Sequence, residues 1–387
     1  MQLAAQHTES HPTPAALERS ASFVVPGLLA LADGLVLTGR LAGATQVGEG
    51  ELVFTTAATG WGEILTDPSY AGQIVVLTHP MAGSYRIARS ELESSRVHAR
   101  GLVVTRLVEP PRGPGLALRE LADEGGIPII EGLDTRALTL RLRLGAARRA
   151  VILSADEGEE AAVERALASP PWDAIDHVTA VATAEPFAVA AAGHRRARAV
   201  LVDYGVKRSL LAALAERGIE LDVLPPTATV ADIAALAPDL VVLSPGPGDP
   251  SNMASQIDVV RDLARAAIDG GAPILGVCLG HQLLALAAGA ETHRLPVGHH
   301  GGNHAVLEAA SGRVDIGAHN HEVEVVDGHA LAEAGYRVSH RDLNDGTVEG
   351  LAHESGRIAS VQFHPEGAPG PIDASRVFDL ALDGALA

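Results

Sequence analysis

The spacing of apolar positions differs between the two halves of the chain. In the first half, short apolar runs recur between Gly, Pro and Asp turns, as in GLVLTGRL, ELVFTT, QIVVLTHP and GLVVTRL. Short runs of this composition, bounded by turn residues, predict β-strands. Three segments have helical spacing instead, namely residues 116–123, 135–144 and 159–168. We therefore predict a β-rich α/β domain over residues 26–180.

The second half alternates strictly between strand-like and helix-like runs. The predicted strands are 198–202, 220–224, 240–243 and 273–277, and the predicted helices are 207–217, 230–236, 256–268 and 279–288. Helical crossovers of this length require parallel pairing of the strands. Residues 199–387 are therefore predicted to form a doubly wound α/β domain with a mostly parallel sheet. Ligands of such sheets bind beyond the carboxyl ends of the strands.

Two segments show neither the strand-like nor the helix-like spacing of apolar residues. Residues 1–25 are mostly polar and are predicted to form a mobile N-terminal extension. Residues 181–198 are rich in Ala and poor in large apolar side chains, and we interpret them as a linker between the two domains.

Composition narrows the class of protein. The formal net charge of -19 argues against a nucleic-acid partner, because phosphate neutralisation requires clustered Lys and Arg. A single cysteine cannot form an intramolecular disulfide, and the N-terminus lacks the pattern of a secretory signal, so we expect a cytoplasmic protein. The chain has no uninterrupted apolar run of about 18 residues, so we also expect no membrane span.

The only cysteine, Cys278, lies in GVCLGHQLLA, where a predicted strand meets a predicted helix. Gly276 and Gly280 complete the pattern G-x-nucleophile-x-G, a turn so tight that a Cβ at either glycine would collide. A thiol at this elbow projects above the sheet, close to the N-terminus of the next helix, whose dipole favours the thiolate. The alternative is a small buried cysteine without a catalytic role.

Two histidines are candidates for the base that serves Cys278. His281 is near in sequence, but it shares the first helical turn with the nucleophile, and a structural role fits it better. In SVQFHPEGAPGP, His364 and Glu366 are two residues apart at the end of an apolar strand, so their side chains face the same side. Cys278, His364 and Glu366 then form a nucleophile, a base and a carboxylate that orients the base.

An oxyanion hole follows from the same elbow. The backbone N–H of Leu279 comes directly after the nucleophile, and a second N–H would come from Gly246 or Gly248 in the loop SPGPGDP.

These motifs resemble a known family. GVCLGHQLLALAAGA with FHPE is similar to the class I glutamine amidotransferases, which use a Cys–His–Glu triad, and this resemblance covers about residues 199–387. TGWGEILTDPSYAGQIVVLTHP, ESSRVHARGLVV and LDTRALTLRLR resemble the small subunit of carbamoyl phosphate synthetase, as do GHHGGNH and NDGTVEGL. This second resemblance runs from about residue 29 to the C-terminus.

The resemblance also implies which residues contact the substrate. The positions that match the family's glutamine contacts are Gly246, Gly248, Leu279, Gln282 and Asn320.

Three nearby positions depart from the family pattern. Ala57 replaces a serine, and Glu322 and Val323 replace a Gly-Phe pair. We expect Ala57 to remove a hydroxyl from the substrate pocket, and one neutral hydrogen bond is worth about 0.5–1.5 kcal/mol. A buried Glu322 would matter more.

The implied activity is hydrolysis of L-glutamine through a thioester. The ammonia would pass through an internal tunnel to a large partner subunit, which makes carbamoyl phosphate from bicarbonate and ATP for arginine and pyrimidine biosynthesis. The loop SPGPGDP lacks the G-K-[ST] ending of a phosphate-binding loop, so we expect ATP and Mg on the large subunit. We expect no cofactor and no metal on this chain.

Three alternatives remain at this stage. Five histidines between residues 299 and 321 raise the question of a metal, although their spacing matches no known ligand pattern. Ala57 and Glu322 are also compatible with a non-catalytic regulatory subunit that has a degraded glutamine pocket. Finally, the amidotransferase domain could serve another synthetase, such as one making anthranilate or guanine nucleotides, which the motifs of the first half disfavour.

Overall fold

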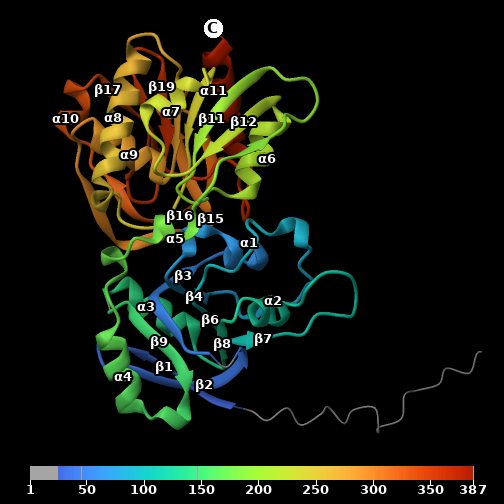
Figure 1. The fold of residues 1–387 in the computed structure, drawn as a ribbon. Helices are drawn as coiled ribbons and strands as arrows, with labels where there is room; N and C mark the ends of the chain where they lie inside the picture. The colour runs from blue at the N-terminus through green and yellow to red at the C-terminus, as the bar shows by residue number, and fades with distance from the viewer. Residues whose placement is uncertain (1–24, 45, 146, 387) are drawn as a thin grey trace, which may run out of the picture.

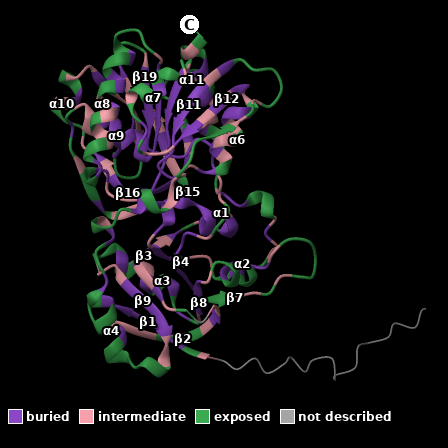
Figure 2. Ribbon diagram, viewed as in Figure 1, coloured by how far each residue is buried: buried purple, intermediate pink, exposed green. Residues whose placement is uncertain are grey.

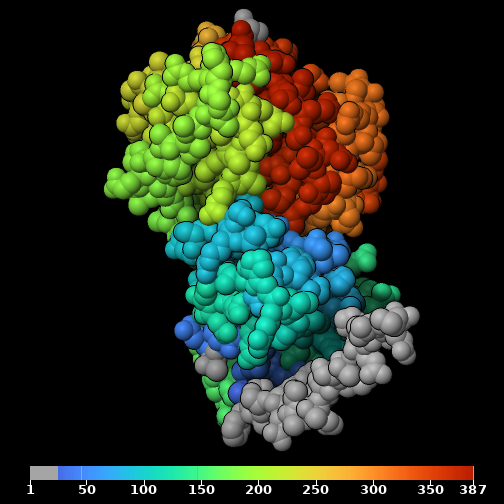
Figure 3. Space-filling model, turned by 90° about the vertical axis from the view of Figure 1, so that its right-hand side faces the viewer, coloured from blue at the N-terminus to red at the C-terminus, as the bar shows by residue number. Residues whose placement is uncertain are grey.

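The computed structural model describes residues 25–44, 46–145 and 147–386. Its two lobes are stacked, with the first half of the chain in one and the second half in the other (Figures 1 and 3). The predicted N-terminal extension lies outside the described residues except for Val25, which begins strand β1.

The first lobe is built around a closed barrel with the strand order β1-β2-β8-β6-β4-β3-β9. These strands are β1 (Val25–Leu31), β2 (Val36–Gly43), β3 (Gly48–Thr55), β4 (Gln73–Leu77), β6 (Gly101–Val104), β8 (Pro128–Glu131) and β9 (Arg149–Ser154). The pairs β3–β4, β4–β6 and β6–β8 are parallel. Closure leaves no free sheet edge.

Helices pack against this barrel, and those predicted from the sequence are present. They are α1 (Trp61–Thr66), α2 (Leu118–Glu124), α3 (Thr135–Arg143) and α4 (Glu159–Ala168). The short helix α5 (His177–Val181) follows them, and its Val178 packs in an apolar cluster of the second lobe. Strand β4 is buried along its whole length. Its Val75 packs in a cluster with Ile64 of α1, and its Val76 packs in a second cluster with Leu138 of α3. Such burial on both faces explains why the strand reads as a continuous apolar run.

Several short elements lie between the barrel strands or follow the last of them. They are the paired strands β5 (Met81–Ala82) and β7 (Arg106–Leu107), and the 3-10 helices η2 (Pro68–Tyr70), η3 (Arg89–Glu91), η4 (Ala155–Glu157) and η5 (Trp172–Ala174).

The second lobe contains a ten-stranded sheet with the order β10-β12-β11-β13-β14-β19-β18-β16-β15-β17. Its strands are β10 (Phe187–Val189), β11 (Ala197–Val202), β12 (Ile219–Leu224), β13 (Leu240–Leu243), β14 (Ile274–Val277), β15 (Thr292–Glu308), β16 (Val314–Val325), β17 (Tyr336–Asp342), β18 (Val348–His353) and β19 (Ile358–Val361). Strands β12, β11, β13, β14 and β19 are parallel to one another, which confirms the predicted doubly wound core. The remaining pairs are antiparallel, and the alternating pattern did not indicate this half of the sheet.

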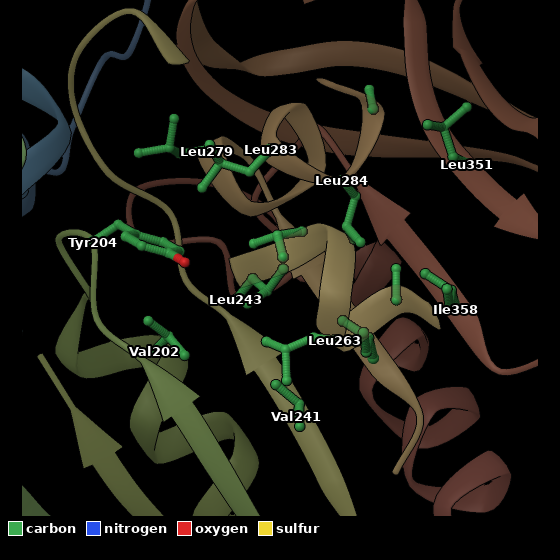
Figure 4. Packing of buried hydrophobic residues seen from close by; sticks show 14 of the residues in the cluster. Val202, Tyr204, Val241, Leu243, Leu263, Leu279, Leu283, Leu284, Leu351 and Ile358 are labelled. Atoms are coloured by element: carbon green, nitrogen blue, oxygen red, sulfur yellow. The ribbon is translucent and has the colours of Figure 1, made fainter. Parts of the chain in front are cut away.

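Helices cover both faces of this sheet (Figures 1 and 2). They are α6 (Arg208–Glu216), α7 (Val230–Ala235), α8 (Ala254–Ile268), α9 (Leu279–Ala287), α10 (His329–Glu333) and α11 (Arg376–Leu386), with 3-10 helices η6 (Pro250–Asn252) and η7 (Asp373–Ser375). One apolar cluster joins the sheet to α7, α8 and α9, where Leu243, Leu263 and Leu284 meet (Figure 4). The opposite cluster joins the sheet to α6 and α11 through residues such as Leu214 and Phe378.

The predicted linker needs correction. Phe187–Val189 form strand β10, which pairs with β12 at the edge of the second sheet, and β11 begins at Ala197. The edge strand was missed because it is only three residues long and largely exposed, so it carries no alternating pattern.

Candidate active site

Cys278 occupies the strained elbow that its flanking glycines indicate. It joins β14 to α9 with φ 51° and ψ −105°, and its side chain is buried. A Cβ at Gly276 would lie 2.8 Å from the carbonyl oxygen of Gly280, and a Cβ at Gly280 would lie 2.3 Å from that of Leu243. Since no side chain fits at these distances, the backbone can make this turn only with glycine at both positions.

The predicted base and its carboxylate lie together after β19. His364 Nδ1 is 2.8 Å from Glu366 Oε1, and both side chains are buried. His364 Nε2 has no hydrogen-bond partner among the described residues, so this nitrogen is free to exchange a proton with a reacting group. The structure thus fixes the imidazole through one nitrogen and leaves the other available.

His281, the rival base, has a structural environment. Its Nδ1 is 2.9 Å from the Ser360 hydroxyl, and the ring is fully buried. Burial lowers the pKa of His281 to about 4, which outweighs the opposing effect of Glu349. The histidine is therefore neutral and held within the fold, as expected.

Lys207 is a further residue of the site, and it contacts the carboxylate of Glu366. Sequence reasoning did not identify it. This fully buried ammonium lies 3.0 Å from Glu366 Oε1 and donates to the carbonyl oxygens of Gly367 and Ala368 at 2.9 and 3.1 Å. The available signal was its position in DYGVKR, just beyond the carboxyl end of β11, at the predicted ligand edge.

The charges of this group support one another. Burial and Lys207 lower the pKa of His364, but Glu366 and the neighbouring Cys278 outweigh them and raise it to about 10. Burial raises the pKa of Glu366, but Lys207 and His364 outweigh it and lower it to about 2. At neutral pH the pair is therefore an imidazolium beside a carboxylate, with a proton ready on the histidine.

A pocket opens beside Cys278 at the contact between the two lobes. The second lobe contributes most of the residues that sequence reasoning assigned to glutamine: Gly246, Gly248, Gln282, Asn320, Glu322 and Val323. The first lobe contributes Ser69 and Gln73, with Trp172 from the segment that follows the barrel. Leu279 does not line the pocket with its side chain, which packs in the core, so only its backbone is available there.

The polar residues of the second lobe are held in place. Gln282 donates to the carbonyl oxygen of Val323 at 2.9 Å and to the side chain of Gln362 at 3.0 Å. Asn320 donates to Asp67 at 3.0 Å, and its Oδ1 lies 2.8 Å from His300. These bonds fix the walls of the pocket before a ligand arrives.

The expectation that Ala57 removes a hydroxyl from the substrate pocket is wrong. Ala57 is absent from the residues that line the pocket and packs against an apolar cluster of the first lobe. A hydroxyl is supplied instead by Ser69 of η2, whose Oγ is buried without a hydrogen-bond partner among the described residues. Sequence reasoning missed Ser69, although the EILTDPSY motif that contains it carried part of the resemblance.

Glu322 lies in the pocket wall as a paired charge. Its carboxylate contacts Arg148 of the first lobe and lies 2.7 Å from His300 Nε2. Arg294 contacts Glu51 of the first lobe and lies 3.9 Å from Glu322. Burial raises the pKa of Glu322, but His300, Arg148 and Arg294 outweigh burial and lower it to about 2. The departure from the family pattern is thus a charge that these neighbours neutralise.

Comparison with known proteins agrees with this architecture. Residues 200–383 match the family model "Glutamine amidotransferase class-I", and residues 29–152 match "Carbamoyl-phosphate synthase small chain, CPSase domain". Among the described residues, no helix combines the length and the apolar character needed to cross a bilayer.

Curated relatives are similar over nearly the whole chain. The carbamoyl phosphate synthase small chain of Symbiobacterium thermophilum is 42% identical, covering 90% of this chain and 96% of the relative. The small chain of Archaeoglobus fulgidus is 41% identical, covering 92% and 97%. The pyrimidine-specific small chain of Halalkalibacterium halodurans is 40% identical, covering 91% and 94%. On this evidence the chain belongs to the carbamoyl phosphate synthase small chain family and carries a class I glutamine amidotransferase domain.

Proposed function

We propose that this chain is the glutamine-hydrolysing subunit of a carbamoyl phosphate synthase. The observation that carries the proposal is the strained elbow of Cys278, which lines a pocket and is close enough to His364 of the His364–Glu366 pair to raise the pKa of that histidine. Family membership supplies the reaction, and the site supplies the groups that the reaction requires.

The first half of the reaction forms a thioester. The Cys278 sulfur attacks the carboxamide carbon of glutamine, and the resulting oxyanion receives hydrogen bonds from the backbone N–H of Leu279 and from Gly246 or Gly248. The C–N bond then breaks as His364 donates its proton to the departing nitrogen, which leaves as ammonia. The raised pKa of His364 suits this step because the donor is already protonated at neutral pH.

The second half regenerates the enzyme. His364, now neutral, removes a proton from a water molecule that attacks the thioester carbon. The C–S bond breaks, glutamate leaves, and Cys278 returns to the thiolate paired with the imidazolium. Glu366 stabilises the charge on His364 throughout, while Lys207 holds the carboxylate in place.

The pocket walls orient glutamine for this attack. Gly246, Gly248, Gln282, Asn320 and Val323 are placed to contact the substrate. The anionic Glu322 offers an acceptor for its α-ammonium group.

The ammonia has a destination outside this chain. In water it would become mostly ammonium and lose its nucleophilic lone pair, so direct delivery to a large subunit is chemically useful. We propose that the large subunit holds ATP and Mg and makes carbamoyl phosphate, and that both subunits work in the cytoplasm.

Replacement of the nucleophile tests the proposal. In the complex with the large subunit, Cys278→Ser should lower glutamate release from glutamine by at least about 10⁴-fold. Carbamoyl phosphate synthesis from added ammonia should continue, since that chemistry lies on the partner. A wild-type complex that releases no glutamate would contradict the proposal in favour of a non-catalytic subunit. Full activity in His364→Ala would exclude His364 as the base.

A further inference from the structure

A second group of buried side chains lies on the β15–β16 hairpin, outside the triad. His299 of β15, His319 and His321 of β16, and Glu349 of β18 are all buried. One ligand atom from each lies within 4.8 Å of the others. The histidines raised the question of a metal in the sequence, but their irregular spacing over two strands matched no ligand pattern, and Glu349 was not among the candidates.

The outer nitrogen of each histidine is already occupied. His321 Nδ1 is 3.0 Å from the carbonyl oxygen of Val323, and His319 Nδ1 is 3.3 Å from that of Gly317. A carbonyl can only accept, so His321 Nδ1 carries the proton. The shorter contact of His319 is that of Nε2 with the Glu349 carboxylate, where Nε2 donates, so a metal ion would have to replace this proton. His299 Nε2 is 2.8 Å from the carboxylate of Asp345, which likewise makes this nitrogen the donor.

The inner nitrogens of the three histidines face the carboxylate of Glu349. His299 Nδ1 and His321 Nε2 are buried without a hydrogen-bond partner among the described residues, and each is 3.8 Å from Glu349 Oε1. His319 Nε2 is 2.8 Å from Glu349 Oε2. The nearby hydroxyl of Thr347 is closer to Asp345, at 2.9 Å, than to Glu349, at 3.4 Å. Two buried nitrogens, His299 Nδ1 and His321 Nε2, thus lie beside a carboxylate without a hydrogen-bond partner in the described part of the chain, and a cation between them and Glu349 would supply one.

We propose that His299, His319, His321 and Glu349 bind one divalent transition-metal ion of the zinc type. Three imidazole nitrogens and one carboxylate oxygen form a ligand set typical of Zn²⁺. Bonds of about 2.0–2.1 Å in a tetrahedron separate the ligand atoms by about 3.3 Å. Glu349 Oε1 is 3.8 Å from two of the nitrogens and all four ligand atoms lie within 4.8 Å of one another, so binding would draw the group together. The occupied outer nitrogens supply the hydrogen bonds that orient metal-binding histidines.

The position of this site implies a structural role. Four protein ligands leave no open position for a substrate, which is typical of structural zinc. His321 lines the glutamine pocket together with its neighbours Asn320 and Glu322 on β16. A metal bound by His319 and His321 would therefore fix the strand that forms this part of the pocket wall.

A neighbouring set of residues provides a rival site. His304 and Asp342 form a similar group with the same His299 and His319. His304 Nδ1 is 2.8 Å from Asp342, but this group does not contain the unpartnered His321 nitrogen. We therefore favour the site with Glu349, and variants can separate the two.

Metal binding to tag-free protein tests the proposal directly. After removal of metals with a chelator, the wild-type chain should take up one equivalent of Zn²⁺ by calorimetry and elemental analysis, and its Tm should rise. Co²⁺ in the same site should give the intense visible absorption of tetrahedral coordination. Glu349→Gln and His319→Gln should each weaken Zn²⁺ binding by more than 100-fold. Asp345→Asn should weaken it by about 10–100-fold, because it only orients His299.

Two controls decide the outcome. His304→Gln should bind Zn²⁺ as the wild type does, and so should His293→Gln, an exposed residue on the same strand. Circular dichroism of each metal-free variant separates loss of the site from loss of the fold. Wild-type protein that binds no Zn²⁺ would overturn the proposal. The histidines and Glu349 would then be a group held together by hydrogen bonds. Loss of binding in His304→Gln but not in Glu349→Gln would also overturn it, in favour of the rival set. None of these outcomes depends on glutaminase activity.

Discussion

The catalytic elbow and the pocket wall beside it are built in different ways. The elbow, with Cys278, His364 and Glu366, belongs to the second lobe, and each part follows directly from a strand of one sheet. The wall combines Ser69 and Gln73 of the first lobe with Glu322 of the second. The first region therefore depends on local backbone geometry, whereas the second depends on how the two lobes dock.

This difference predicts different consequences of substitution. Changes at the elbow should reduce kcat, because they remove groups that act in the transition state. Changes in the wall should raise KM or weaken the contact between the lobes, while the chemical step survives. The predictions below test this separation, from the largest expected effect to the smallest.

Glu366→Gln should have the largest effect, lowering kcat for glutamine by about 10²–10⁴-fold. The amide cannot stabilise the imidazolium, so the pKa of His364 should fall from its present value of about 10. Because protonated His364 acts as the acid, activity falls as the pH rises through its pKa. In the variant this fall should occur at a lower pH than in the wild type. A matched substitution at an exposed site, Glu354→Gln, should leave both kcat and the profile unchanged. An unchanged kcat in Glu366→Gln would show that the carboxylate is dispensable.

Lys207→Met should mainly reduce stability. Loss of a buried ion-pair partner costs about 3–5 kcal/mol, and the carbonyl oxygens of Gly367 and Ala368 would also lose their donor. The pKa of Glu366 should rise because Lys207 lowers it in the wild type. Denaturant unfolding measures the loss, and Arg208→Met, next along the chain and more exposed, provides the comparison. Equal stability of the two variants would contradict a positioning role for Lys207.

Arg148→Met should weaken the wall without touching the triad. A hydrogen bond to a charged group is worth about 1.5–3 kcal/mol, and Glu322 would keep only His300 and Arg294. The pKa of Glu322 is about 2, below its ordinary 4.5, so the carboxylate stabilises the fold above the unfolded pKa. This contribution is lost as the pH falls towards 2. The variant should therefore begin to unfold at a higher pH on acid titration. An unchanged acid midpoint would show that the ion pair contributes nothing to stability.

Ser69→Ala should have the smallest measurable effect. If its unpartnered hydroxyl bonds glutamine, its loss costs about 0.5–1.5 kcal/mol, or at most about tenfold in KM, with kcat preserved. Ala57→Ser, which restores the serine of the family pattern, should leave KM unchanged because Ala57 lies outside the pocket. A lower KM in Ala57→Ser would instead restore the original expectation that its missing hydroxyl weakens binding.

The sequence was most informative where a backbone constraint was local. The glycines on either side of Cys278 indicated a tight elbow, and the spacing of His364 and Glu366 placed both side chains on one face. The strand–helix alternation likewise predicted the parallel core. The antiparallel half of the sheet was not predicted, because the pairing of β15, β16, β17 and β18 is set by contacts between distant segments.

By itself, then, the sequence identified the candidate nucleophile, base and carboxylate, since each is specified within a few residues of a turn or strand end. Only the tertiary structure decided the rest of the site. In the folded chain Lys207 is buried beside Glu366, and Glu322 pairs with Arg148. Ser69, and not Ala57, lines the pocket. Those outcomes depend on the packing of segments far apart in the chain, separated by 174 positions in the case of Arg148 and Glu322. Neither periodicity nor spacing records which distant charges and hydroxyls will meet.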